Sequence, residues 1–318
     1  MTIEDIENVL NLADFELIRT WSEFLWPLST PLIAPFFNQF LVKFWPIKIL
    51  ALTNFVLARN RPSHIQPRAV KASQEQGISE PSISIIIPAR NEAGNISQIF
   101  TRTPRMGRKT ELVFVEGHSK DDTYAVVERE VAAHPEWKCQ LIRQTGIGKG
   151  DAVRLRFEKA CGEIMMIMDA DLTVPPGDLA GFYEALRSGK GEFINDVRLV
   201  YPMEDQAMRF LNLVGNKFFN LTFSWLLGQP IKGTLCGTKA LWKYDYDRIA
   251  ANRKYFGDFD PFGDYDLLFD AAKLGLIIVY LPIRYRERTY GQTNIQRWKH
   301  GWLLLRMEFY AAWRIKFV

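Results

Sequence analysis

Between residues 82 and 170, short runs of apolar residues alternate with stretches that have helical spacing. The predicted strands are 82–87, 111–115, 140–143 and 164–168, and the predicted helices are 95–100, 121–133 and 151–160. Short apolar runs bounded by turn residues are typical of buried strands. Strands that alternate with helices form a parallel sheet with helices on both faces, and ligands bind at the carboxyl ends of such strands.

The pattern after residue 190 is less regular. It predicts strands at 192–200 and 277–281 and helices within 203–227, 264–274 and 301–316. The last helix is amphipathic, because four apolar residues recur at helical spacing on one face. These residues are Trp302, Leu305, Phe309 and Trp313.

The first 58 residues are apolar, aromatic and interrupted by prolines, whereas residues 59–82 are polar and have no periodicity. A transmembrane helix needs roughly 20 uninterrupted apolar residues, and the prolines and lysines of 24–58 interrupt every such run. We predict short helices that lie on a membrane surface or pack on the main domain. The expected order is a helical segment (1–58), a linker (59–82), a catalytic domain (83–295) and an amphipathic helix (296–318).

Composition and charge narrow the class of protein. The chain has 318 residues and a net charge of +4, with no concentrated basic block, so nucleic acid is not an expected partner. Its three cysteines lack metal or redox spacing, which favours reduced thiols in the cytosol. The first ten residues are acidic, unlike the start of a signal peptide.

Asp169 and Asp171 directly follow the apolar run 164–168 and flank one alanine. Two like charges this close repel each other and would raise a carboxyl pKa. A divalent cation removes the repulsion, and Mg²⁺ or Mn²⁺ suits carboxylate oxygens and also binds phosphates. A strand-end turn is the simpler alternative, but the position after a buried strand favours a metal site.

Four motifs occur in order over residues 82–295. They are Pro88-Ala89-Arg90-Asn91-Glu92, then Val115 to Thr123, Gly148-Lys149-Gly150 and Asp169-Ala170-Asp171-Leu172. With these motifs the chain resembles the family 2 glycosyltransferases, and within them the dolichol-phosphate mannose synthase and polyprenyl-phosphate group. The resemblance implies an α/β GT-A fold with a Rossmann-like mixed sheet, here with an N-terminal helical appendage. It also implies inversion at the sugar carbon and a divalent metal on the diphosphate.

The same resemblance implies roles for individual residues. Asp169 and Asp171 correspond to the metal and diphosphate aspartates, and Arg288 corresponds to an arginine that binds phosphate. The expected catalytic residues are Asp171, Asp264 and Arg288. The expected nucleotide-sugar ligands are Pro88, Ala89, Arg90, Glu92, Glu116, Lys149, Asp169, Arg198 and Arg209. Arginine suits this chemistry because its planar fork binds phosphate oxygens bidentately.

The sequence departs from the family pattern at several points. Glu116 and Gly117 replace two adjacent aspartates, Thr173 stands where glutamine is frequent, and a family loop becomes Gly233-Thr234-Leu235-Cys236-Gly237. These departures leave open a non-catalytic protein that binds nucleotide sugars at a membrane. Transfer that requires metal would exclude that alternative.

The acceptor depends on Asp264. A lipid phosphate is already an anion and needs no general base, whereas a sugar hydroxyl does. The function that the resemblance implies is transfer of a hexose from a UDP- or GDP-sugar to a polyprenyl phosphate, with Mg²⁺ or Mn²⁺ as cofactor. The alternative is a saccharide or other hydroxyl acceptor, with Asp264 as base. The aromatic N-terminal segment and the basic, aromatic C-terminal helix predict a peripheral protein on the cytoplasmic face of a membrane. Packing of the C-terminal helix on the core is the alternative.

Overall fold

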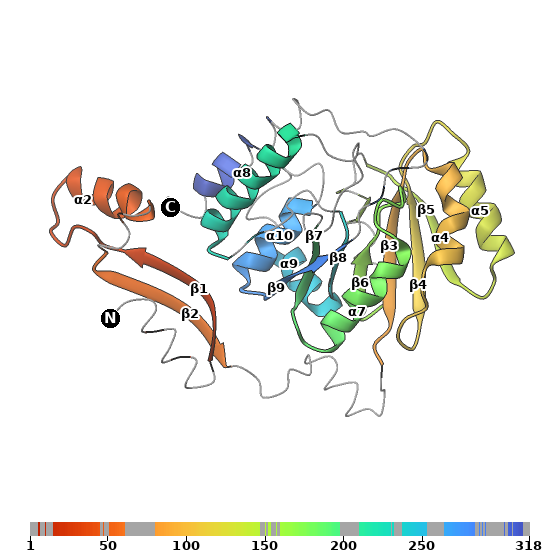
Figure 1. The fold of residues 1–318 in the computed structure, drawn as a ribbon, viewed down its shortest axis with the longest axis horizontal. Coiled ribbons are helices and arrows are strands. Elements are labelled where there is room, and N and C mark those ends of the chain that lie inside the picture. Colours follow the sequence, from red (N-terminus) through yellow and green to blue (C-terminus); the bar gives the residue numbers. More distant parts are fainter. Residues whose placement is uncertain are drawn as a thin grey trace. The chain divides into compact units, whose positions relative to one another are not determined.

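A computed structural model describes most of the chain, which divides into two compact units (Figure 1). The described residues are 6, 10, 15–44, 47, 51–60, 80–146, 150, 152–153, 157, 160–197, 210–229, 231, 237–252, 264–283, 286, 288, 290, 302, 305–306 and 308–313, with backbone alone at 60, 210–217, 252 and 264–266. The hairpin unit comprises Met1–Ser63, Phe219–Ile231 and Ile295–Val318. The sheet unit comprises His64–Phe218 and Lys232–Asn294.

A seven-stranded sheet is the centre of the sheet unit. Across the sheet the strands are β5 (Lys138–Arg143), β4 (Thr110–Glu116), β3 (Ile83–Ala89), β6 (Ile164–Ile167), β8 (Lys239–Trp242), β7 (Phe193–Val197) and β9 (Ile278–Pro282). Strand β8 runs antiparallel to both of its neighbours, and the other pairs are parallel. The predicted α/β class with a mixed sheet is confirmed.

Side chains on both faces of the central strands are buried, as their continuous apolar runs predict. Ile85 of β3 and Phe114 of β4 belong to the same core cluster as Ile99 of α4 (Ile96–Arg102). Helices α5 (Thr123–Ala133) and α7 (Leu179–Arg187) add buried side chains to that cluster. Helix α9 (Lys243–Asn252) supplies Tyr246, whose ring packs edge-on against Phe157 at 4.6 Å. Because β3, β4, β5 and β6 are parallel, their carboxyl ends lie at one edge of the sheet.

Most predicted elements of the sheet unit occur, and three others were missed. The predicted strands correspond to β3, β4, β5, β6, β7 and β9, and 264–274 corresponds to α10 (Asp264–Lys273). The sequence did not indicate β8, α7 or α9. The helix expected within 203–227 is described as α8 (Phe210–Leu227), whereas most of 151–160 lies outside the described residues.

The helical prediction for residues 1–58 is wrong for two segments. β1 (Phe15–Glu23) and β2 (Thr53–Asn60) form an antiparallel pair, and only the connection contains helical turns, in α2 (Ile33–Pro35) and the two short helices Phe36–Phe40 and Leu41–Lys43. Cross-strand pairs explain the difference. Trp21 lies opposite Phe55 and stacks on it at 5.2 Å, and Ser22 donates a hydrogen bond to Asn54 Oδ1 at 2.9 Å. Aromatic and polar cross-strand pairs stabilise a hairpin.

Within the hairpin unit, the end of α8 contacts both the β1–β2 connection and the C-terminal segment. Trp225 Nε1 donates to the carbonyl oxygen of Lys43 at 2.8 Å, and Thr222 Oγ1 donates to Glu308 Oε1. The described residues between 302 and 313 are helical, as the sequence predicts. Among the described residues, no helix is both long and apolar enough to cross a membrane.

Glu308 generates a prediction about pH and stability. Burial raises the pKa of its carboxyl from the ordinary 4.5 to about 7, although the Thr222 hydrogen bond opposes the rise. Between these values the folded chain retains a proton that the unfolded chain has released, so stability declines as pH rises through the window. Glutamine keeps the acceptor without the charge. Glu308→Gln should therefore raise the free energy of unfolding above pH 7 by about 1–3 kcal/mol.

Denaturant titrations at pH 5, 7 and 8.5 measure this effect. Glu184→Gln is the matched control, because that carboxylate is exposed on α7. An equal effect of both substitutions, or a Glu308→Gln effect that is independent of pH, would contradict the prediction.

Candidate functional site

Three loops at the carboxyl edge of the sheet have a left-handed backbone residue. Asn91 follows β3 with φ 57°, His118 follows β4 with φ 58°, and Leu172 follows β6 with φ 56°. Non-glycine residues occupy this region rarely and at a cost, and such strain persists only where surrounding contacts impose it. The three loops are therefore held in fixed conformations around one edge.

Hydrogen bonds join the loops after β3 and β4. Gly117 N donates to the carbonyl oxygen of Ala89 at 2.9 Å. Asn91 N donates to Ser119 Oγ at 3.1 Å, and Lys120 N donates to Asn91 Oδ1 at 2.7 Å. Glu116 is buried and accepts a hydrogen bond from Ser119 N, so one of its oxygens shapes this loop. Arg90, by contrast, is exposed at the end of β3.

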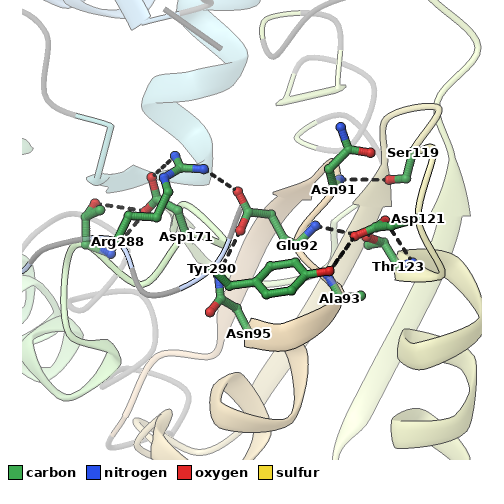
Figure 2. Close-up of polar contacts among 11 residues, drawn as sticks. Asn91, Glu92, Ala93, Asn95, Ser119, Asp121, Thr123, Asp171, Arg288 and Tyr290 are labelled. Carbon is green, nitrogen blue, oxygen red and sulfur yellow. Dashed lines mark hydrogen bonds and ion pairs between the residues drawn. The ribbon is translucent and has the colours of Figure 1, made fainter. Parts of the chain in front are cut away.

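Arg288 bridges two carboxylates from different loops, as Figure 2 shows. Its Nη1 lies 2.8 Å from Glu92 Oε1, and its Nη2 lies 2.6 Å from Asp171 Oδ2. Both carboxylates are largely buried, with side-chain exposures of 8% and 14%. Two carboxylates in a partly dry site need a positive charge, and the arginine fork supplies two directed donors. The structure thus brings together three of the residues that the sequence predicted.

Thr173 fixes the other oxygen of Asp171. Its N–H and hydroxyl donate to Asp171 Oδ1 at 3.1 and 2.8 Å. Its carbonyl oxygen accepts a hydrogen bond from Arg286 N at 2.9 Å, two residues before Arg288. The threonine that departs from the family pattern therefore orients the aspartate and anchors the segment that carries Arg288.

Glu92 has an unusual electrostatic environment. Burial raises the pKa of its carboxyl to about 7. The Arg288 cation opposes this rise, and the Asp171 charge adds to it. Its second oxygen accepts a hydrogen bond from Asn95 Nδ2 at 2.7 Å. The sequence did not indicate a role for Asn95 in the site, because an asparagine directly before a helix is usually an N-cap residue. Glu92 thus contacts Arg288 through one oxygen and Asn95 through the other.

Tyr290 and Asp121 close the side of the site near α5. Tyr290 OH donates to Asp121 Oδ2 at 3.3 Å, and Ala93 N donates to the same oxygen at 3.3 Å. The tyrosine ring packs over Gly94, where an added Cβ would lie 2.5 Å from ring atom Cδ2. Asp121 also accepts a hydrogen bond from Thr123 N at 3.1 Å in the turn before α5, whose N-cap residue is Asp122. The contact of Asp121 with Tyr290 could not be read from local spacing.

The chemistry of Asp169 and Asp171 suits a hard divalent cation. Asp169 follows β6 and is partly exposed, and Asp171 lies two residues further along the same loop. Within the described part of the chain, no three histidine, cysteine or acidic side chains gather as a metal site. Mg²⁺ is commonly bound by one or two carboxylates, with phosphate oxygens and waters completing the shell. The two aspartates therefore fit a cation that arrives with a phosphate ligand.

Several predicted site residues are not placed. Lys149, Arg198 and Arg209 lie outside the described residues. Asp264 is the first residue of α10, and only its backbone is described. Pro88 and Ala89 end β3, directly before the Asn91 turn.

Asn91 provides a direct test of the strained loops. Asn91→Gly removes the hydrogen bond to Lys120 N but allows positive φ at no steric cost, whereas Asn91→Ala removes the bond and keeps the steric cost. Alanine should therefore destabilise the chain more than glycine, by about 1 kcal/mol. Urea denaturation of both variants measures the difference. If glycine destabilises as much as alanine, the strain does not contribute.

The sequence is similar to those of known glycosyltransferases. The chain is 27% identical over 231 residues to the glycosyltransferase AglJ of Haloferax volcanii, covering 72% of this chain and 71% of AglJ. It is 37% identical over 109 residues to the dolichol-phosphate mannosyltransferase of Saccharomyces cerevisiae, covering 32% of this chain and 40% of that enzyme. The chain thus spans less than half the length of the yeast enzyme.

A solved structure with a similar fold is glucosyl-3-phosphoglycerate synthase of Mycobacterium tuberculosis in complex with Mn²⁺, UDP and glucosyl-3-phosphoglycerate. The TM-score is 0.54 at 20% identity, over 81% of this chain and 86% of that one. The predicted GT-A fold is confirmed. The family model for glycosyl transferase family 2 matches residues 84–249, more than half of the chain, so this protein belongs to glycosyltransferase family 2.

Proposed function

We propose that this glycosyltransferase moves a hexose from a UDP- or GDP-sugar to a polyprenyl phosphate, with inversion at the sugar carbon. The observation that carries the proposal is the placement of Arg288 between Glu92 and Asp171 at the carboxyl edge of the sheet. Arg288, together with a divalent cation on the aspartate pair, would complement the negative charge of a sugar nucleotide's diphosphate. UDP and Mn²⁺ in the mycobacterial synthase support the donor and cofactor. The name of the yeast relative supports the lipid acceptor.

The residues around the donor have different proposed roles. Asp169 and Asp171 would hold Mg²⁺ or Mn²⁺, which when bound neutralises charge on the diphosphate leaving group. Arg288 donates to phosphate oxygens, and Glu92 and Thr173 keep its segment in place. Pro88, Ala89, Arg90 and Glu116 line the nucleotide. Lys149, Arg198 and Arg209 are further expected phosphate contacts.

The acceptor chemistry follows from charge. An acceptor phosphate oxygen forms a bond to the anomeric carbon while the bond from that carbon to the diphosphate breaks, and the nucleoside diphosphate leaves with the electron pair. Because the acceptor is already an anion, no proton has to be removed. Asp264 therefore has no required role as base in this reaction.

The location of the acceptor suggests where the protein works. A polyprenyl phosphate resides in a membrane, so the enzyme works at a membrane surface. Cys139 is a free thiol, which suits the reducing cytoplasmic side. These two points support the cytoplasmic face.

A donor panel tests the proposal. UDP- and GDP-hexoses are each offered with polyprenyl phosphate and Mn²⁺ or Mg²⁺, and lipid-linked sugar is scored by mass spectrometry. We expect product with one donor class, none in EDTA, and a fall in kcat of at least about 100-fold in Asp171→Asn. Asp247→Asn is the control, because that aspartate is exposed on α9. Donor binding without transfer to any acceptor would instead support the non-catalytic alternative.

The variant Asp264→Asn separates the two acceptor classes in the same assay. Transfer to polyprenyl phosphate should stay within about threefold of the unmodified chain, because no general base is needed. Near-complete loss of turnover with donor binding intact would contradict the lipid-phosphate acceptor and favour a hydroxyl acceptor.

A further inference from the structure

Exposed apolar side chains are concentrated in the hairpin unit. Twenty large apolar or aromatic side chains are exposed among the described residues. Three of them, Phe218, Tyr244 and Tyr290, belong to the sheet unit, and the other 17 belong to the hairpin unit. Single exposed apolar residues are ordinary, but a concentration of this kind marks an interaction surface.

The C-terminal helix turns its apolar face outward. Trp302 is 72% exposed, Phe309 75% and Trp313 56%, whereas Glu308 is 9% and Ala311 2% exposed. A surface helix of a soluble protein normally buries its apolar stripe and exposes its polar side. Here the carboxyl of Glu308 faces inward to Thr222. The orientation therefore needs an apolar environment outside the chain.

The neighbouring end of α8 repeats this arrangement. Leu221 is 72% exposed and Trp225, four residues later on the same face, is also exposed, while Phe223 and Leu226 are buried on the other side. Figure 1 shows the last helical segment beside α8, and the hydrogen bond from Thr222 to Glu308 joins them. The two outward stripes belong to adjacent helices.

The connection between β1 and β2 displays a third apolar group. Leu32 is 87% exposed and adopts φ 65°, and Phe36 and Phe40 are exposed after it. The connection is internally fixed, because Asn38 Oδ1 accepts hydrogen bonds from Leu25 N and Trp26 N, each at 2.8 Å, and Asn38 Nδ2 donates to Trp26 O at 2.9 Å. The apolar side chains are therefore presented by an ordered scaffold.

Charge identifies the partner. The hairpin unit contains ten Lys or Arg and seven Asp or Glu, and its basic excess lies in residues 295–318, which contain five Lys or Arg and one Glu. Basic residues beside aromatic and apolar ones suit the headgroup region of an anionic bilayer. A second copy of the chain would bring the same basic segments against each other, which opposes self-association.

We infer that the hairpin unit is a docking surface for an anionic lipid bilayer, into whose interface the exposed side chains of the β1–β2 connection, α8 and the C-terminal helix insert. This surface goes beyond the proposed sugar transfer, because it depends on neither the donor nor the acceptor. Through this surface the protein would bind a bilayer without a spanning helix among the described residues.

Flotation of the full chain with liposomes tests the inference. We expect flotation with vesicles of phosphatidylcholine and phosphatidylglycerol, and weaker flotation with phosphatidylcholine alone or at high salt. The double variants Leu32→Glu with Phe36→Glu, and Trp302→Glu with Phe309→Glu, should each lower the vesicle partition coefficient at least about tenfold. Tyr244→Glu, an exposed aromatic of the sheet unit, is the matched control and should change nothing.

Three further measurements distinguish a loss of vesicle binding from misfolding and from a loss of sugar transfer. Circular dichroism and thermal melting should show unchanged folding, because every substituted side chain is exposed, and Phe309→Leu should retain binding. Transfer to a short-chain, water-soluble polyprenyl phosphate should be unaffected in the double variants, which separates this surface from the proposed function. The inference is overturned if the chain binds neither vesicle, or if it sediments as a dimer that the double variants dissociate.

Discussion

The geometry of the candidate site depends on one ion-paired arginine. Glu92 follows β3 and Asp171 follows β6, and their carboxylates lie in one partly buried space. Two negative charges there would repel each other strongly. Arg288 supplies the opposing charge and two directed hydrogen bonds. Because Arg288 comes from the segment after β9, this ion pair joins three parts of the chain that are distant in sequence. A ligand diphosphate would meet a site whose cation and carboxylates are already placed, which lowers the cost of ordering them during binding.

The surrounding contacts explain how the ion pair keeps its geometry. Thr173 occupies one oxygen of Asp171, so the other oxygen faces Arg288. Asn95 donates a hydrogen bond to one oxygen of Glu92, so the other oxygen of Glu92 faces Arg288. The left-handed residues after β3, β4 and β6 turn the chain sharply at the sheet edge, and hydrogen bonds between loops hold two of these turns together. A constellation supported in this way is rigid enough to position a reacting group.

The sequence predicted elements and residues whose signal is local. Apolar runs predicted β3, β4 and β6 because both faces of these strands are buried. Strand β8 was missed because it begins with Lys239, which leaves an apolar run too short to indicate a strand. The hairpin was missed because its stability comes from pairs such as Trp21 with Phe55, which lie far apart in sequence. The pattern of the C-terminal helix located an apolar stripe, but periodicity cannot say whether a stripe faces the core or the outside.

The same distinction holds for the site. Asp171, Glu92 and Arg288 were predicted from motifs. Asp121 and Tyr290 meet through a tertiary contact that no local spacing encodes, and Asn95 contacts Glu92 three residues before it. In the proposed function, Arg288 is a phosphate ligand that Glu92 and Asp171 position before the nucleotide binds. Calorimetric titration of UDP and GDP in Mn²⁺ tests it most directly, with Arg288→Gln compared against Arg286→Gln, a neighbouring exposed arginine. We predict that Arg288→Gln weakens nucleotide diphosphate affinity at least about tenfold while Arg286→Gln leaves it unchanged. Equal affinity in both variants and the unmodified chain would show that Arg288 does not bind the diphosphate.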